Sequence, residues 1–114
     1  MSTIKVRNLN KKPNWLQKLI KTDYYRRYVI NQLSPIKLGD IVVEKTTQSE
    51  YLVIDIELAA FKNQDIRYSK LHLFSKKKFI SVSLYVSAVV SDYSVKQSAI
   101  KLQFDKDLDT IIKE

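Results

Sequence analysis

The sequence contains no cysteine and a single histidine, His72. Without cysteine there is no disulfide framework, no thiolate nucleophile and no zinc site with sulfur ligands. A single histidine also excludes the HExxH motif and any metal site built on two histidines. We therefore expect no metal and no cofactor. A small cysteine-free domain suits a reducing compartment, so the expected location is the cytoplasm, or a virion if the protein is encoded by a phage.

Glycine is almost missing as well. Gly39 stands alone among 114 residues, whereas an average usage of about 7% would give roughly eight. A P-loop, a dinucleotide-binding fingerprint and a GxSxG elbow each require several glycines, because the backbone must approach phosphate closely or turn sharply. None of these motifs is present. The absences together predict a protein that is not an enzyme.

Long apolar runs are also absent. The longest such stretch, residues 79–90, is interrupted by serines and is shorter than the roughly 20 residues of a transmembrane helix. Residues 1–15 contain basic residues but no apolar segment of a signal peptide. The basic, amphipathic segment 14–33 could attract anionic lipid, but Asp23 and Arg27 interrupt its apolar stripe. We therefore do not expect a membrane partner.

Positive charge, in contrast, is abundant and unevenly placed. Of 20 basic and 12 acidic residues, nine basic residues and one acid, Asp23, lie in residues 1–39, so eleven of each sign remain for the rest of the chain. The whole net charge of +8 therefore comes from one third of the sequence. A segregated cationic surface of this kind favours binding to a polyanion.

The first third of the chain has helical periodicity. Residues 3–7 alternate as a short strand does, and residues 14–33 place apolar side chains at helical spacing. Thr22 and Asp23 are typical of a fresh helix start, so the segment is either one bent helix or two short helices. Ser34 and Pro35 end it.

After Pro35 the periodicity changes from helical to alternating. Leu38 to Asp40 form a turn in which Gly39 takes a positive φ. In the second strand Tyr51, Asp55 and Glu57 point outward. The predicted strands are 41–45, 50–58, 66–74, 79–91 and 96–104, with hairpin loops at 46–49 and 75–78 and a turn at 91–95. Residues 106–114 are predicted to close the chain as a short helix.

These elements predict one α+β domain over residues 1–114. A basic helical segment (1–38) packs on an antiparallel β body (39–105), and a short C-terminal helix (106–114) follows. The body is a meander of about five strands, because its connections are too short for parallel crossovers. It forms either a curled sheet or a small, partly open barrel, in which the long strand 79–91 could bend and serve both halves.

The preferred function is binding of nucleic acid through its phosphate backbone, without sequence readout. The sequence contains no zinc finger, no RNP1 pattern and no GxxG loop that would read bases. The cationic candidates are Lys5, Arg7, Lys11, Lys12, Lys18, Lys21, Arg26 and Arg27, extended by Lys76, Lys77 and Lys78. The rings that could stack on unpaired bases are Trp15, Tyr24, Tyr25 and Tyr28. For Trp15, spacing with Leu16, Leu19 and Ile20 favours packing in the core instead.

The alternative is a structural or assembly protein of a larger complex, such as a phage virion or a secretion particle. Aromatic and arginine side chains in the helical segment are the types that anchor protein interfaces. The Ser/Val/Tyr face of 79–91 is nearly uncharged, and strand edges could join copies into a homo-oligomer. A bias toward lysine, isoleucine and tyrosine is typical of the AT-rich genomes of phages and mobile elements.

One acidic pair resembles a catalytic arrangement. Asp55 and Glu57 lie two apart on one strand, so both carboxylates point the same way, and such a pair could hold Mg²⁺. A nuclease of the Asp…Glu-x-Lys kind needs a lysine where this chain has Ala59. We therefore interpret the pair as solvent-facing, and His72 as a partly buried structural residue.

Overall fold

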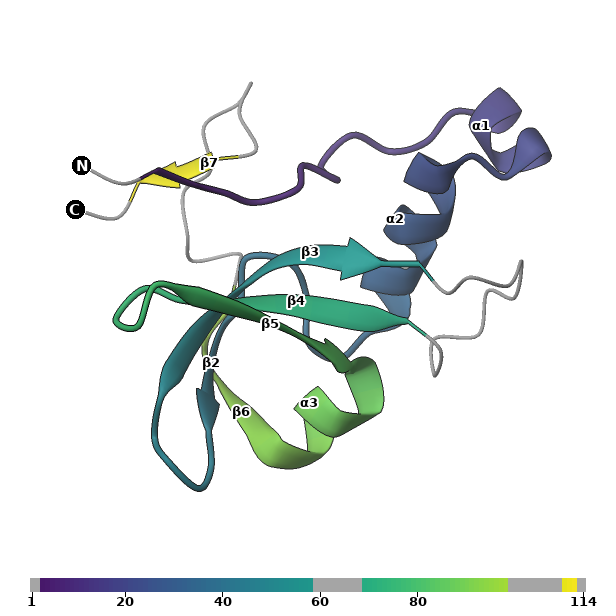
Figure 1. Cartoon of the computed structure of the whole chain (residues 1–114). Coiled ribbons are helices and arrows are strands. Elements are labelled where there is room, and N and C mark those ends of the chain that lie inside the picture. The colour runs from purple at the N-terminus through teal and green to yellow at the C-terminus, as the bar shows by residue number, and fades with distance from the viewer. Residues whose placement is uncertain (1–2, 59–68, 99–109, 113–114) are drawn as a thin grey trace.

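The computed structural model describes residues 3–58, 69–98 and 110–112, and its fold is α+β (Figure 1). The elements, in chain order, are β1 (Thr3–Lys5), α1 (Trp15–Ile20), α2 (Asp23–Leu33), β2 (Ile41–Glu44), β3 (Glu50–Glu57), β4 (Lys70–Ser75), β5 (Ile80–Tyr85), α3 (Val86–Asp92), β6 (Tyr93–Gln97) and β7 (Thr110–Ile112). The predicted class, with helices before an antiparallel sheet, is confirmed. No helix within the described ranges has the length and apolar character needed to cross a membrane.

The main sheet has five antiparallel strands in the order β5-β4-β3-β2-β6 and does not close. The strands β2 to β5 form the predicted meander. β6 does not continue it, but pairs with β2 at the opposite edge, and α3 makes the connection from β5. β1 and β7 form a separate two-stranded ribbon, visible at the upper left of Figure 1.

The prediction of one long strand over 79–91 is wrong. The strand β5 stops at Tyr85, and the chain continues as the helix α3, which buries Val86 and Val89. In a strand, Val86 would share a face with Val82 and Val90, and Val89 would lie on the opposite face. In a helix, Val86 and Val89 are three apart and share one face. The chain forms a helix here, and this helix connects β5 at one edge of the sheet with β6 at the other edge. The predicted turn at 91–95 is also wrong, because Ser91 and Asp92 end α3 and Tyr93 begins β6.

A short helix near the C-terminus is present, but it is α3, and the predicted helix over 106–114 is wrong at residues 110–112. Residues 110–112 form β7, antiparallel to β1. Thr110, Ile111 and Ile112 are β-branched, which favours a strand over a helix. The remainder of the predicted helix, and the parts of predicted strands at 66–68 and 99–104, lie outside the described residues.

β3 departs from simple alternation. Its register with β4 shifts between Val53 and Asp55, which marks a β-bulge. Tyr51, predicted to face outward, is buried, and its ring meets that of Tyr93 edge-on at 5.7 Å. A bulge inserts one extra residue, so side chains before and after it follow different alternations. The prediction for Tyr51 is therefore wrong.

The predicted helical segment 14–33 forms two short helices and not one bent helix. Asn14 begins α1 with a capping box, in which its side chain accepts from the Gln17 N–H while the Gln17 side chain accepts from the Asn14 N–H. Lys21 ends α1 in the left-handed conformation (φ 51°). Thr22 then caps α2 through its hydroxyl, as predicted, by accepting from the Tyr25 N–H at 3.1 Å. Gly39 takes the predicted positive φ, 85°.

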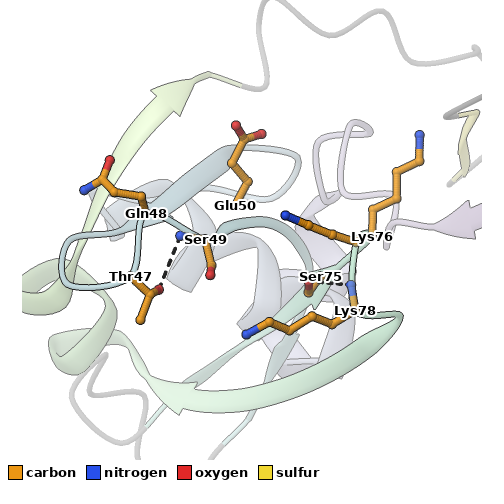
Figure 2. A pocket seen from close by; sticks show the side chains of 8 residues that line it. Thr47, Gln48, Ser49, Glu50, Ser75, Lys76 and Lys78 are labelled. Atoms are coloured by element: carbon orange, nitrogen blue, oxygen red, sulfur yellow. Dashed lines mark hydrogen bonds between the residues drawn. The ribbon is translucent and has the colours of Figure 1, made fainter.

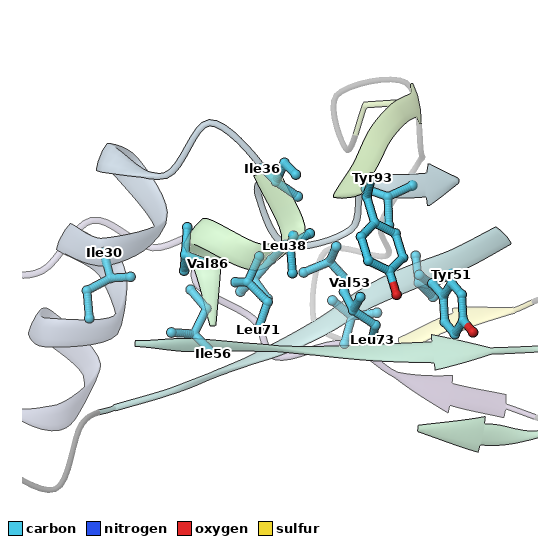
Figure 3. Close-up of a cluster of buried hydrophobic side chains, with 14 of the residues drawn as sticks. Ile30, Ile36, Leu38, Tyr51, Val53, Ile56, Leu71, Leu73, Val86 and Tyr93 are labelled. Carbon is cyan, nitrogen blue, oxygen red and sulfur yellow. The ribbon is translucent and has the colours of Figure 1, made fainter. Parts of the chain in front are cut away.

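The hydrophobic core lies between the sheet, α2 and α3 (Figure 3). Strand residues such as Val53, Ile56, Leu71 and Leu73 form its centre, and none of them is measurably exposed. α2 contributes Ile30, which is 2% exposed, whereas no residue of α1 is buried. The fold therefore anchors α2 firmly and leaves α1 outside the core.

Candidate functional site

The apolar side chains of α1 are exposed. Trp15 is 74% exposed, Leu16 48%, Leu19 69% and Ile20 62%. These positions share one face of a helix, with Gln17 and Lys18 on the other. The expectation that Trp15 and its apolar neighbours pack into the core is therefore wrong.

The polar side of α1 is the one that faces the protein. Gln17 lines a hollow of about 340 Å³ together with Tyr24 of α2. Lys18 lines a second hollow, of about 240 Å³, against the α2 residues Tyr25 and Tyr28. A surface helix normally turns its apolar side inward. In α1 the arrangement is reversed, and Figure 1 shows the helix at the periphery, away from the sheet.

Two of the predicted phosphate-binding arginines contact an acid of the sheet. Arg7 binds Asp55 through two contacts, Nε to Oδ1 at 2.5 Å and Nη2 to Oδ2 at 3.2 Å. Arg27 reaches Asp55 Oδ1 at 3.4 Å and also donates to the carbonyl of Ile56. Asp55 therefore joins the N-terminal segment and α2 to β3. Guanidinium groups used in this way have fewer donors for phosphate.

The remaining cations divide into paired and exposed groups. Arg26 pairs with Asp23 at 3.6 Å, one turn earlier in α2. Lys5 is exposed on β1. Four further lysines are exposed around α1 and form no ion pair within the part of the chain that the structure describes; they are Lys11, Lys12, Lys18 and Lys21. We call these four the α1 lysines.

The helix tyrosines are partly used by the fold itself. Tyr24 and Tyr28 pack against the core. The hydroxyl of Tyr24 donates to the carbonyl of Lys11, which fixes the segment before α1 against α2. Burial raises the pKa of Tyr24 above its ordinary 10.0. Of the four predicted stacking rings, Trp15 is exposed, whereas Tyr24, Tyr25 and Tyr28 are partly buried.

The three lysines of the predicted 75–78 loop do not join the N-terminal cations. Lys76, Lys77 and Lys78 lie in the turn between β4 and β5, at the end of the sheet away from α1 and α2 (Figure 1). There they border a hollow of about 540 Å³, shared with the β2–β3 loop (Figure 2). The structure therefore has two separate cationic regions instead of one.

The two carboxylates of β3, on Asp55 and Glu57, have different partners. Glu57 accepts hydrogen bonds from His72 Nε2 at 2.9 Å and from the Ser83 hydroxyl at 3.3 Å. The hydrogen bond from His72 lowers the pKa of Glu57. Asp55 is bound by the two arginines instead. Within the described ranges, no group of three or more His, Cys, Asp or Glu side chains could hold a metal ion.

Comparisons with known proteins give no relative: no family model, no curated protein and no solved structure matches this chain. We therefore infer the function from the surfaces of this structure alone. Sequence reasoning missed the exposure of α1, although one signal was available. The capping residues Asn14 and Thr22 make α1 a short separate helix, and a helix of six residues adds little to a core.

Proposed function

We propose that this protein is a non-enzymatic binding module of a larger assembly, and that the apolar face of α1 is its contact surface. The observation that carries the proposal is the reversed orientation of α1, which exposes Trp15, Leu16, Leu19 and Ile20 together. Large apolar side chains grouped in this way mark an interaction site on a soluble protein. Tryptophan is also among the residues that dominate binding energy at interfaces.

The partner that fits this surface is a protein with an apolar groove rimmed by acidic residues. A short amphipathic helix binds such grooves through its apolar side chains. The α1 lysines surround the helix, so an acidic rim would complement their charge. A second copy of the chain fits less well, since two molecules of net charge +8 repel each other.

Site-specific photocrosslinking in cells of the native host tests this function. A photoreactive residue replaces Leu19 in one variant and Thr46, which is exposed in the β2–β3 loop, in the control. We expect a discrete crosslinked protein from position 19 and none from position 46, and loss of the product when Trp15→Ser is added. The crosslinked partner should have an acidic surface.

Three results would overturn the proposal. Crosslinking of the protein only to itself would identify a homo-oligomer, and equal products from positions 19 and 46 would indicate nonspecific contact. Binding to vesicles of anionic lipid, abolished by Trp15→Ser, would assign α1 to a membrane surface instead. In the parent chain the single tryptophan, Trp15, gives a second readout, because its fluorescence shifts to shorter wavelength when the side chain leaves water.

Binding of nucleic acid remains a second candidate, supported by the α1 lysines. All four residues are exposed, and Tyr25 lines a hollow beside Lys12 and Lys18. The arginines support it less, because Arg7 and Arg27 bind Asp55. Titration of labelled single- and double-stranded DNA and RNA at two salt concentrations is the test, with all four α1 lysines changed to glutamate as the variant. Salt-sensitive binding that this variant loses would support the candidate, and absence of binding to tens of micromolar would reject it.

A further inference from the structure

Two hairpin loops border a hollow at the end of the sheet opposite α1 and α2 (Figures 1 and 2). The β2–β3 loop forms one wall and the turn between β4 and β5 forms the other. Its volume, about 540 Å³, falls within the range of about 300–1,000 Å³ that is usual for small-molecule sites. The residues that line it are Thr47, Gln48, Ser49, Glu50, Ser75, Lys76, Lys77 and Lys78.

The charge around this hollow is positive and incompletely balanced. Lys77 and Lys78 form no ion pair within the described residues. The one acid that lines the hollow, Glu50, is already bound by Lys96, with Nζ and Oε2 2.5 Å apart. Consecutive lysines in a tight turn repel one another. An anionic ligand would relieve this repulsion.

Both walls are held in place by local hydrogen bonds. The Thr47 hydroxyl donates to Glu44 at 2.7 Å and accepts from the Ser49 N–H at 3.3 Å. In the other wall, the Ser75 hydroxyl accepts from the Lys78 N–H at 3.2 Å (Figure 2). The hollow is therefore formed before any ligand arrives.

Each loop also contains a residue in the left-handed backbone region. These are Gln48 in the β2–β3 loop, with φ 63°, and Phe79 at the end of the lysine turn, with φ 54°. This conformation is disfavoured for residues other than glycine, most of all for a bulky one. Backbone strain of this kind gathers at ligand sites. Here both strained residues belong to the loops that form one hollow.

We propose that this hollow binds a small polyanion that contains adjacent phosphate groups. Lysine is a common phosphate ligand, since its ammonium group is a compact charge with three donors. In Figure 2 the side chain of Lys78 extends toward the loop that holds Thr47 and Ser49. The hydroxyl group of Ser49 can add a neutral hydrogen bond from that side, whereas the Thr47 hydroxyl already donates to Glu44.

The placement of the lysines selects a chain of phosphates over a single one. In Figure 2 the side chains of Lys76 and Lys78 point in different directions, so a ligand with several anionic centres suits them better than a single phosphate does. A diphosphate or triphosphate offers several anionic centres a few bonds apart. Such a group occurs both in nucleoside triphosphates and in inorganic polyphosphate, and the two sources share the chemistry that the hollow recognises.

Isothermal titration calorimetry of the purified chain tests the proposal, with tripolyphosphate, ATP, adenosine and orthophosphate as probes at physiological salt. We expect saturable binding of tripolyphosphate and ATP, and much weaker binding of orthophosphate. Adenosine should not bind by itself. Tighter binding of ATP than of tripolyphosphate would identify a nucleotide as the ligand, and equal affinities would identify the bare phosphate chain.

Two variants of equal charge separate this site from general attraction. Lys77→Ala with Lys78→Ala should weaken tripolyphosphate binding about tenfold or more, since each removes a charged hydrogen bond. Lys37→Ala with Lys70→Ala removes the same charge from two residues that do not line the hollow and should change the affinity by less than about twofold. Equal weakening in both variants, or no saturation by tripolyphosphate at millimolar concentration, would overturn the proposal.

Discussion

α1 and α2 are neighbours with similar sequence patterns and opposite roles. Both place apolar side chains at helical spacing, yet α2 buries Ile30 to 2% exposure while α1 leaves Trp15 74% exposed. The difference lies in attachment. α2 is joined to the sheet by Arg27, which binds Asp55 and the carbonyl of Ile56. Among the described residues, no side chain of α1 makes such a contact with the sheet, and the polar side of α1 faces α2. An amphipathic pattern therefore identifies a helix and its apolar face, but does not show whether that face meets the protein's own core or a partner.

The largest expected contrast is in stability. Ile30→Ala should lower the free energy of unfolding by about 2–5 kcal/mol, because it leaves a cavity in the core. Leu19→Ala, which removes the same number of carbon atoms from α1, should change it by no more than about 0.5 kcal/mol. Urea unfolding followed by circular dichroism measures both. Similar losses in the two variants would show that α1 packs on the body in solution.

The next contrast concerns how α2 is held. Asp55→Ala should lower the free energy of unfolding by about 1–3 kcal/mol, since Arg7 and Arg27 both lose their acceptor. Glu50→Ala, which breaks the exposed pair with Lys96, is the control and should have an effect of at most about 1 kcal/mol. The same urea titration applies. Equal effects would mean that Asp55 is an ordinary surface acid.

The helix caps sharpen the comparison further. Thr22→Ala should lower the free energy of unfolding by about 1 kcal/mol, because α2 is part of the cooperative fold. Asn14→Ala breaks the capping box of α1 and should change global stability by less than about 0.5 kcal/mol. Its effect should be local, as faster hydrogen exchange of the α1 amides alone. Faster exchange throughout the sheet in this variant would contradict the contrast.

The smallest expected effect is the pH dependence that Tyr24 gives to the free energy of unfolding. Because the folded-state pKa of Tyr24 lies above its ordinary 10.0, the contribution of this phenol to stability is complete below pH 10.0 and is lost as the pH rises through the folded-state pKa. Tyr24→Phe should lower the free energy of unfolding by about 0.5–1 kcal/mol at pH 8, through loss of the hydrogen bond to Lys11.

The difference in the free energy of unfolding between Tyr24→Phe and the parent chain should become smaller above pH 10.0. Comparing the two proteins from pH 8 to 11 by urea unfolding isolates Tyr24, because the other tyrosines titrate in both. A difference that grows over this range would show the opposite shift.

Local features of the fold could be predicted from the sequence. Thr22 as a helix cap and Gly39 in a turn depend on the chemistry of one or two residues, and both are present. The strands β2, β3 and β4 were also expected, since their alternation is regular. Their loops follow from the polar residues between them.

Features set by distant contacts could not be predicted. Val86 and Val89 lie on opposite faces of the predicted strand but share one face of the observed helix α3, which leads the chain to β6 beside β2. The burial of Tyr51 depends on a bulge opposite β4. The division of the cations into arginines bound to acids and exposed lysines depends on Asp55, which lies 48 residues after Arg7. No local pattern contains that information.

The β1–β7 ribbon determines how the molecule can be tethered. Thr3 lies opposite Ile112, so a tag or neighbouring domain fused to either end would leave the body from the same spot. In Figure 1 that spot is remote from α1. A chain immobilised on a sensor chip through an N-terminal or a C-terminal tag would therefore present the Trp15 surface to the analyte in the same orientation.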